Sequence, residues 1–307
     1  MPHHEVFSRF RRYSGAVPAG FRVDFLGTME SDKFNTGLLG VSPYPDGTTV
    51  QKVPYPQPSE EYFEWIDLLE SVVAASGSYT MIELGAGYGR WAVRAAFAAQ
   101  RYNPKLRCHL IAVEPEPTVY RWLKEHFLHN GLKLREHTLL HAAVADEPGE
   151  VEFCIRGPLG SQWDLPPNAW YGQFLTKYST AFGECRPDGK YRGFQVMLHT
   201  SGWRSIRVPG VSLESLLQKL RRVDLIDLDI EGQELASLTS GAAQLDAKVK
   251  RLHIGTHGKE IEAGLRQLLS AHGWRCQADY PLVSTSETPW GPVSFNNGAQ
   301  SWINPKL

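Results

Sequence analysis

Three glycines follow a short apolar run in the segment Met81-Ile-Glu-Leu-Gly-Ala-Gly-Tyr-Gly-Arg90. The apolar run predicts a strand, and the alanine-rich residues 89–101 predict a helix after it. Glycine has no Cβ, so it permits a sharp turn and lets a ligand approach the backbone closely. Doubly wound α/β folds bind nucleotides at such a junction of strand and helix. We therefore expect a cofactor with a nucleoside part to contact Gly85, Ala86, Gly87 and Tyr88.

An acid stands at the end of the next predicted strand, where Glu114 and Pro115 follow the apolar run of residues 108–113. A carboxylate there can accept hydrogen bonds from both hydroxyls of a ribose, so we place Glu114 and Pro115 in the cofactor site. The alternative is a solvated acid at the start of a helix, favoured by the helix dipole. Ala143, in a third predicted strand over residues 137–144, is small enough for an adenine ring to lie against the backbone. Simple strand packing explains Ala143 equally well.

Two kinds of cofactor fit a glycine-rich turn of this type. A dinucleotide prefers the spacing G-x-G-x-x-G, but the sixth position here is Arg90. Glu83 would also bring negative charge beside a pyrophosphate, whereas it suits the cationic aminocarboxypropyl end of S-adenosylmethionine. We therefore expect S-adenosylmethionine as the cofactor, held in part by Glu83. An NAD(P)-dependent oxidoreductase is the less favoured alternative.

Carboxylates gather after the apolar start of a strand predicted at residues 223–230, in the sequence Asp227-Leu-Asp-Ile-Glu-Gly-Gln-Glu234. Strand alternation puts Asp227 and Asp229 on the same side. Ligands of open α/β sheets bind at the carboxyl ends of the strands, and functional sites commonly tolerate repulsion among acids. We expect Asp229 to face the cofactor, its methyl group and the acceptor, and Asp229 or Glu231 to accept or orient the acceptor's proton. Glu234 fits better as an acid that begins a helix.

Two histidines occur in the sequence His253-Ile-Gly-Thr-His-Gly258, at the end of the next predicted strand. His257 lies in the loop that faces the same site, where a histidine can act as a general base near neutral pH. A lone histidine is more often a structural hydrogen-bonding group, and we expect that role for His253. The carboxylates are also of the type that binds Mg²⁺. Because the sequence places no obvious histidine partner beside them, we expect no metal.

Strand and helix patterns alternate from residue 59 onward, with helices predicted at 59–75, 89–101, 117–129, 213–222 and 259–272. This order predicts an α/β fold with a doubly wound, Rossmann-like, mostly parallel seven-stranded sheet covered by helices on both faces. Residues 1–58 are rich in proline and glycine and predict an N-terminal arm or lid before a domain at 59–307. The aromatic-rich residues 156–210 interrupt the pattern as a structureless, lid-like insertion. An apolar cluster under a surface loop explains this insertion equally well.

These segments resemble the FkbM-type methyltransferases, a branch of the class I S-adenosylmethionine-dependent family. The resemblance covers residues 60–305 and includes I-E-L-G-A-G-Y-G at 82–89, A-V-E-P at 112–115, A-A-V-A-D-E-P-G-E-V-E-F at 142–153 and I-D-L-D-I-E-G-Q-E at 226–234. It implies methyl transfer, usually to a hydroxyl oxygen of a sugar or a polyketide-like natural product. It also assigns Gly85, Gly87 and Glu114 to the cofactor and Asp229 and Glu231 to the acceptor side. The N-terminal arm, the aromatic insertion and Gly255-Thr256 depart from the family pattern.

The composition of the chain limits the classes of partner and the location that we expect for the protein. Thirty-two Lys and Arg balance 33 Asp and Glu, so no global field would attract nucleic acid or an anionic membrane. No apolar stretch of 18 residues and no signal-peptide pattern occurs, and the four cysteines form no C-x-x-C pair. We therefore expect a cytoplasmic O-methyltransferase that acts on a small molecule, with an N-methyltransferase or a cofactor-binding protein without catalysis as alternatives. The sequence leaves open whether the chain forms a homodimer.

Overall fold

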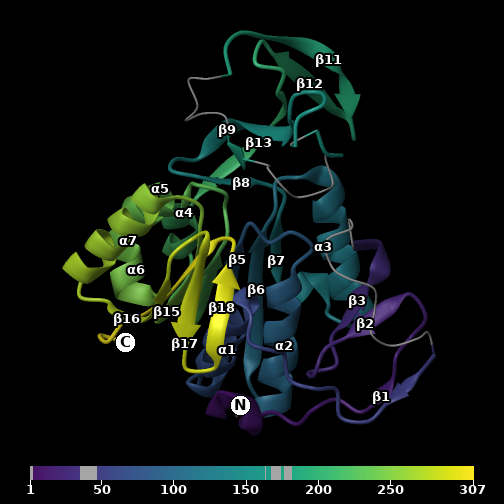
Figure 1. Ribbon diagram of the computed structural model, residues 1–307, viewed down its shortest axis with the longest axis vertical. Helices are drawn as coiled ribbons and strands as arrows, with labels where there is room; N and C mark the ends of the chain where they lie inside the picture. The colour runs from purple at the N-terminus through teal and green to yellow at the C-terminus, as the bar shows by residue number, and fades with distance from the viewer. Residues whose placement is uncertain (1–2, 35–46, 163, 167–173, 176–181) are drawn as a thin grey trace.

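A seven-stranded sheet forms the centre of the computed structural model, which describes residues 3–34, 47–162, 164–166, 174–175 and 182–307 (Figure 1). The strands follow the order β16 (Arg275–Tyr280), β19 (Gly298–Ile303), β15 (Arg251–Thr256), β14 (Leu225–Leu228), β5 (Ser78–Leu84), β6 (Arg107–Val113) and β7 (Thr138–Leu140). The strands from β15 to β7 are parallel to one another, and β19 runs antiparallel to its neighbours β15 and β16. The predicted doubly wound, mostly parallel seven-stranded sheet is confirmed.

Helices cover both faces of this sheet. One face carries α1 (Glu60–Val73), α2 (Arg90–Tyr102) and α3 (Pro117–His129), and the other carries α4 (Leu213–Gln218), α5 (Glu234–Ser240), α6 (Ala242–Lys248) and α7 (Lys259–Ala271). Successive strand residues point to opposite faces, so Met81 belongs to the core under α1 and α2, whereas Ile82 belongs to the other core. The five predicted helices begin within one residue of the expected positions. The helix expected at 213–222 is wrong in length, because it ends at Gln218.

The third predicted strand is split in two. Residues 138–140 form β7, and the chain then leaves the central sheet, so that β8 (Ala143–Ala145) pairs with β13 (Arg204–Ser212) of a second sheet. Two contacts hold the break: the Ala142 amide donates to the Glu114 carbonyl (3.2 Å), and His141 Nε2 lies 3.0 Å from the Pro115 carbonyl oxygen. The prediction of one strand over 137–144 is wrong, because an apolar run does not show where the hydrogen-bonding partner changes.

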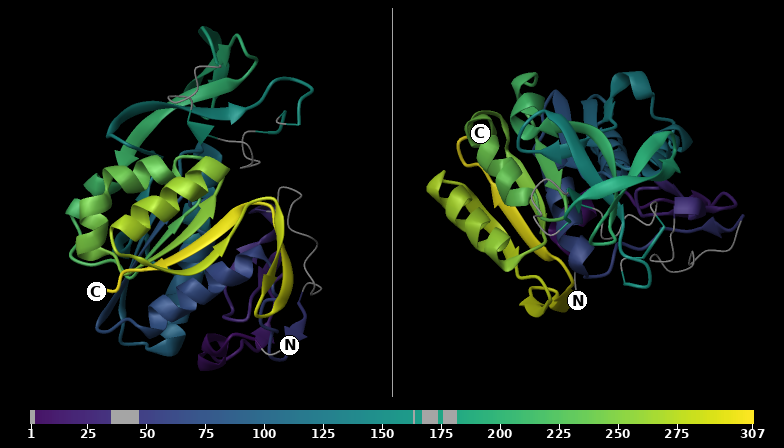
Figure 2. Two further views of the ribbon diagram at one scale, coloured as in Figure 1. Left: turned by 60° about the vertical axis from the view of Figure 1, so that its left-hand side comes forward. Right: turned by 90° about the horizontal axis from the view of Figure 1, so that it is seen from above.

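The second sheet contains β10 (Phe174–Leu175), β9 (Gly149–Arg156), β13, β12 (Phe194–His199) and β11 (Cys185–Tyr191), with β8 beside β13. In Figure 2 it stands beyond the carboxyl ends of the parallel strands. Its own apolar core includes Phe153, Ile206 and Val208. The prediction of a structureless insertion is therefore wrong for residues 182–210, which are mostly strand around an apolar cluster. Residues 163, 167–173 and 176–181 of the insertion lie outside the described part.

The described part of residues 1–58 packs into the domain. Its regular elements are η1 (Glu5–Arg9), η2 (Asp32–Phe34), the pair β1 (Gly15–Ala16) and β4 (Thr49–Val50), and the pair β2 (Phe21–Val23) and β3 (Met29–Ser31). Phe7, Phe25 and Leu26 are fully buried in one core with α1 and α2. Because these side chains complete that core, the described part of the predicted N-terminal arm packs as part of the domain. Residues 35–46 lie outside the described part, and a lid role for this region stays a prediction.

A C-terminal hairpin of β17 (Ser284–Thr288) and β18 (Gly291–Phe295) covers the start of α1. Phe295 contacts Phe63 with ring centroids 5.6 Å apart. The Glu60 carboxylate accepts hydrogen bonds from the amides of Asn296 (2.8 Å) and Asn297 (3.3 Å). The start of α1 is thus fixed beside the end of the central sheet. In the described ranges, no helix has the length and apolarity needed to cross a bilayer.

Candidate active site

The glycine turn after β5 contacts the segment that follows β14. Gly85 has φ of +78°, and a Cβ at this position would lie only 1.8 Å from the carbonyl oxygen of Asp229, after β14. The Asp229 amide in turn donates to the Leu84 carbonyl (3.0 Å). Only glycine combines the left-handed conformation with this close approach. The turn and the acidic segment after β14, predicted separately from the sequence, therefore form one site.

Gly89 serves packing instead. Its φ is +75°, and an added Cβ would lie 2.3 Å from Leu123 Cδ1 and 3.0 Å from Phe127 Cε2, both on α3. A side chain here would push α3 away from the start of α2. The third glycine of the motif thus brings α3 close and does not open space for a ligand.

Glu114, at the end of β6, joins the turn directly. Its Oε2 accepts a hydrogen bond from the Gly87 amide (2.9 Å), and its Oε1 accepts one from the Glu116 amide (2.7 Å). The side chain is 6% exposed. Burial and the nearby charge of Glu116 raise the pKa of Glu114 to about 8, despite the two amides that favour its ionised form. The structure brings together the glycine turn and the acid that the sequence predicts as its partner.

Glu83 has a structural role that the sequence did not predict. Its two carboxylate oxygens accept hydrogen bonds from the amides of Trp91 and Ala92, each at 3.0 Å, in the first turn of α2. These amides have no partner within the helix, and Glu83 is 3% exposed. The Glu83 carboxylate thus holds the start of α2 on β5, and its expected contact with the cofactor stays a prediction.

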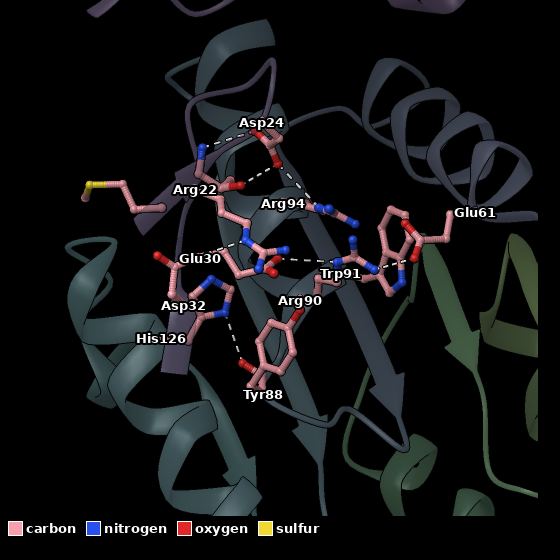
Figure 3. A network of polar contacts seen from close by, with 12 residues as sticks. Arg22, Asp24, Glu30, Asp32, Glu61, Tyr88, Arg90, Trp91, Arg94 and His126 are labelled. Carbon is pink, nitrogen blue, oxygen red and sulfur yellow. Dashed lines mark hydrogen bonds and ion pairs between the residues drawn. The ribbon is translucent and has the colours of Figure 1, made fainter. Parts of the chain in front are cut away.

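The side chain of Tyr88 points away from the turn into a buried cluster (Figure 3). It stacks on Phe34 with ring centroids 5.0 Å apart and meets His126 edge-on at 5.4 Å. Its backbone carbonyl oxygen lies 3.0 Å from His126 Nδ1. The Tyr88 ring thus belongs to this cluster, and the expected contact of Tyr88 with the cofactor stays a prediction for the backbone of the turn. Tyr88 anchors the turn to α3 and to the N-terminal segment.

Arg90 belongs to the same network. Its Nε lies 3.4 Å from Glu30 Oε2 and its Nη1 contacts Glu61, while Arg94 one turn later pairs with Asp24 (3.3 Å). A cation at the first position of a helix opposes the helix dipole, and the two glutamates offset that cost. These ion pairs tie the N-terminal segment and α1 to the start of α2.

The two other residues expected at the cofactor, Pro115 and Ala143, lie in different parts of the structure. Pro115 is buried beside Glu114, and its carbonyl oxygen contacts His141 as described above. Ala143 is 2% exposed and packs into the core of the second sheet. The chain has already left the central sheet at Ala143, and contact of this residue with the cofactor stays a prediction. Ala142, one residue earlier, lies next to Glu114, because its amide bonds to the Glu114 carbonyl.

Asp229, Glu231 and His257 meet between the ends of β14 and β15. His257 Nε2 lies 3.3 Å from Asp229 Oδ1 and 3.8 Å from Glu231 Oε2. The Asp229 side chain is 56% exposed, so its carboxylate is open to a ligand. Glu231 has φ of +50°, which is uncommon for a residue with a side chain. The structure brings together the three residues predicted as catalytic.

Glu234 organises this group, a role that the sequence did not predict. It begins α5 as expected, but its carboxylate is fully buried. Its Oε1 lies 2.8 Å from His257 Nδ1 and accepts hydrogen bonds from the amides of Ile230 (3.3 Å) and Gly232 (3.0 Å). One carboxylate therefore fixes both the loop that carries Glu231 and the orientation of the His257 ring.

The charges around His257 argue against its predicted role as the general base. Burial alone would lower its pKa, but the hydrogen bond to Glu234 and the negative charges of Asp229 and Glu231 raise the pKa to about 10. At neutral pH His257 is thus an imidazolium whose Nδ1 donates to Glu234, while its Nε2 faces the carboxylates of Asp229 and Glu231. Burial raises the pKa of Glu231 to about 7, an effect that His257 partly offsets. Glu231 is the better proton acceptor near neutral pH.

A second buried cluster lies deeper along the same strands. Glu64 of α1 meets Asp227, and burial together with the charge of Asp227 raises the pKa of Glu64 well above its ordinary value. The carboxyl groups of Glu64 and Asp227 interact, and burial raises the pKa of Asp227 to about 6. His253 Nδ1 contacts Asp67 Oδ2 at 2.8 Å, and His253 is 5% exposed. The predicted structural role of His253 fits this arrangement, while Glu64 gave no signal in the sequence.

Among the described residues, two groups of side chains have the donor types and spacing of metal ligands: Asp229, Glu231 and His257, and the deeper set Glu64, Asp227 and His253. In each set the ligand atoms lie within 4.8 Å of one another. The stated reason for expecting no metal, the lack of a histidine beside the carboxylates, is therefore wrong. A protonated His257 has no lone pair to offer an ion, however, and already supplies positive charge to the carboxylates. A site that works without metal stays our prediction.

Comparisons with known proteins agree with this site. A family model described as the methyltransferase FkbM domain matches residues 83–276, which include the glycine turn, Glu114 and the group around His257. A protein of Jannaschia sp. (strain CCS1) named "Putative methyltransferase" is 26% identical over 239 residues, which cover 77% of each chain.

Two solved structures are also similar. The first, methyltransferase FkbM from Methylobacillus flagellatus KT, has 11% identity and a TM-score of 0.44, over 80% of this chain and 50% of that one. The second, precorrin-6y C5,15-methyltransferase from Geobacter metallireducens GS-15, has 12% identity and a TM-score of 0.39, over 78% of this chain and 86% of that one.

Proposed function

Because the chain belongs to the FkbM family of methyltransferases, we propose that it transfers a methyl group from S-adenosylmethionine to a hydroxyl oxygen of a small molecule, a sugar or another natural product. The observation that carries this proposal is the joining of three features at one end of the sheet. The glycine turn, Glu114 and the exposed Asp229 are connected by the Gly87–Glu114 hydrogen bond and by the close approach of Asp229 to Gly85.

The donor lies across the strand ends in this proposal. Its ribose hydroxyls would donate to the remaining lone pairs of the Glu114 carboxylate, which keeps the amides of Gly87 and Glu116. Its methionyl part follows the backbone of Gly85 to Gly87, and its methyl group faces Asp229. The strand order β14, β5, β6 supports this placement, because it sets these groups side by side in that sequence.

S-adenosylmethionine supplies a methyl group on a positively charged sulfur, which leaves as S-adenosylhomocysteine. The acceptor oxygen forms the new C–O bond as the S–CH₃ bond breaks, and its proton passes to Glu231. Asp229 orients the acceptor hydroxyl, and the protonated His257 holds both carboxylates in place. Positioning the two reactants in line contributes much of the rate in such a reaction.

The test uses S-adenosylmethionine with a labelled methyl group and a panel of matched hydroxyl and amine acceptors. We expect binding of S-adenosylhomocysteine, no binding of NADH, and label transferred to a hydroxyl acceptor. Transfer only to amines would favour the N-methyltransferase alternative, since an acidic site also attracts cations. Binding of NADH in place of S-adenosylhomocysteine would refute the proposal.

A further inference from the structure

The hairpin of β11 and β12 ends beside the proposed donor site, at the start of α3 (Figure 1). At its tip, the Tyr191 hydroxyl lies 2.6 Å from Thr118 Oγ1, and Arg192 Nε donates to the same oxygen at 3.0 Å. Thr118 is 3% exposed. Arg192 adopts a left-handed turn conformation with φ of +50°. The tip is thus fixed on one threonine by two hydrogen bonds.

The contacts continue from the tip to Glu114. Glu116, immediately before α3, is fully buried, and its Oε2 accepts the Val119 amide (2.6 Å). Its own amide donates to Glu114 Oε1 (2.7 Å). Tyr191 and Arg192 contact Thr118, two residues after Glu116, and both lower the pKa of the Glu116 carboxyl group against burial, which raises it. The hairpin tip therefore acts on the segment that positions Glu114.

Aromatic rings extend this surface toward β7. Phe194, the first residue of β12, meets His141 edge-on with ring centroids 5.5 Å apart. His141 stacks on Tyr120 of α3 at 4.8 Å and contacts the Pro115 carbonyl oxygen (3.0 Å). Tyr120 and Phe194 thus contact the ring of His141, which links the loop after β7 to the loop after β6.

The strand order gives the direction of a nucleoside bound at this end of the sheet. β14, β5, β6 and β7 are consecutive neighbours, each about 4.8 Å from the next. With the methyl group at Asp229 and the ribose at Glu114, the base continues away from β14 toward the loop after β7. Flat aromatic groups are favourable neighbours for a base.

We propose that the hairpin tip, residues 191–194, forms the outer wall of the nucleoside end of the donor site, and that Tyr191 and Arg192 are positioning residues for Glu114. This inference rests on the proposed function and adds to it a part of the chain that lies in the aromatic insertion. It assigns the hairpin of β11 and β12 within that insertion to binding of the donor nucleoside.

The test is calorimetric binding of S-adenosylhomocysteine to the full-length variants Tyr191→Phe, Arg192→Ala and the double variant. We expect the double variant to raise Kd about ten-fold, the effect of losing hydrogen bonds that hold a binding group in place, and Tyr191→Phe alone to raise it less. The matched control is Arg204→Ala, which removes the Asp188–Arg204 ion pair (2.8 Å) of the same sheet, remote from α3. The control variant is expected to bind as the wild type does.

A second measurement separates positioning from general destabilisation. In a Glu114→Gln background, the two tip substitutions are expected to raise Kd by a smaller factor than in the wild type, because the part of their effect that acts through the carboxylate is then absent. At saturating acceptor, KM for S-adenosylmethionine should rise while kcat changes less than two-fold. A double variant with wild-type Kd, or an equal loss in the Glu114→Gln background, would overturn the inference. Failure of the wild type to bind S-adenosylhomocysteine would instead refute the proposed function.

Discussion

Donor binding should depend on pH through Glu114. In the free protein the pKa of this carboxyl group is about 8, so about one molecule in ten carries the carboxylate at pH 7. The proposed ribose contacts need the ionised form, because both ribose hydroxyls donate to it. Binding therefore has to release a proton below pH 8. The Kd for S-adenosylhomocysteine is expected to rise about ten-fold for each pH unit below 8 and to level off above it.

The variant Glu114→Gln tests this reasoning, since its side chain has the same shape and does not titrate. It loses one amide contact, because its NH₂ group faces a backbone N–H, and it loses the charge-assisted bonds to the ribose. We expect binding weaker by about 2 to 3 kcal/mol at pH 9. The loss at pH 7 should be about 1.4 kcal/mol smaller, because the wild type then has to ionise.

The assay is calorimetric titration with S-adenosylhomocysteine at several pH values, in pairs of buffers with different ionisation enthalpies to count the protons released. S-adenosylhomocysteine lacks the charged sulfur, so changes at the nearby carboxylates contribute little. A Kd that stays constant from pH 6 to 9, or a pH dependence that survives in Glu114→Gln, would refute the reasoning.

Three further predictions concern the rest of the site. Gly85→Ala should lower the free energy of unfolding by about 2 to 5 kcal/mol in denaturant titration, because of the left-handed φ of Gly85 and the clash of a Cβ with the Asp229 carbonyl. The control Gly131→Ala, at a position with φ of +72° and open space, should lower it by about 1 to 2 kcal/mol, and equal losses would contradict the proposed contact. Glu231→Gln should lower kcat by about 10²- to 10⁴-fold with donor affinity preserved. The kcat of the wild type should fall as the pH drops below about 7, since the base must be ionised, and a kcat that does not change with pH would exclude Glu231 as the base. Treatment with a chelator should leave activity unchanged, because the protonated His257 already neutralises the carboxylates, and restoration of lost activity by Mg²⁺ would show that a metal takes part.

The sequence predicts the central sheet well because the buried parallel strands are continuous apolar runs separated by amphipathic helices. The grouping of the site follows from the same topology. Carboxyl ends of neighbouring parallel strands meet at one edge of a sheet. This arrangement brings Glu114 close to Gly87, and Asp229 close to His257, for any conformation of the connecting loops. These predictions depend on which residues end a strand and not on side-chain direction.

Side-chain direction is the part that sequence patterns do not determine. Tyr88 stands within the glycine motif, yet its ring turns toward Phe34, a contact 54 residues distant that no local spacing indicates. Glu83 turns to the unpaired amides of α2. Glu234 looks like an ordinary acid at the start of a helix until the fold brings His257 to it. Each of these orientations depends on a partner elsewhere in the chain.

The aromatic insertion shows a similar limit. Strand β13 pairs with β8 and β9, from which a long segment of the insertion separates it in the sequence. The hydrophobic pattern of the insertion alone is compatible with loops. The break at Ala142 likewise depends on the Glu114 carbonyl, which belongs to another strand. Local composition therefore shows where the regular alternation stops but not which elements replace it.

A structure of the protein with bound S-adenosylhomocysteine tests the central claim most directly. The account predicts both ribose hydroxyls within about 3 Å of the Glu114 carboxylate oxygens, the sulfur facing Asp229, and the base beside His141 and the hairpin tip. A ribose distant from Glu114, or a ligand bound away from the ends of β5 and β6, would contradict it.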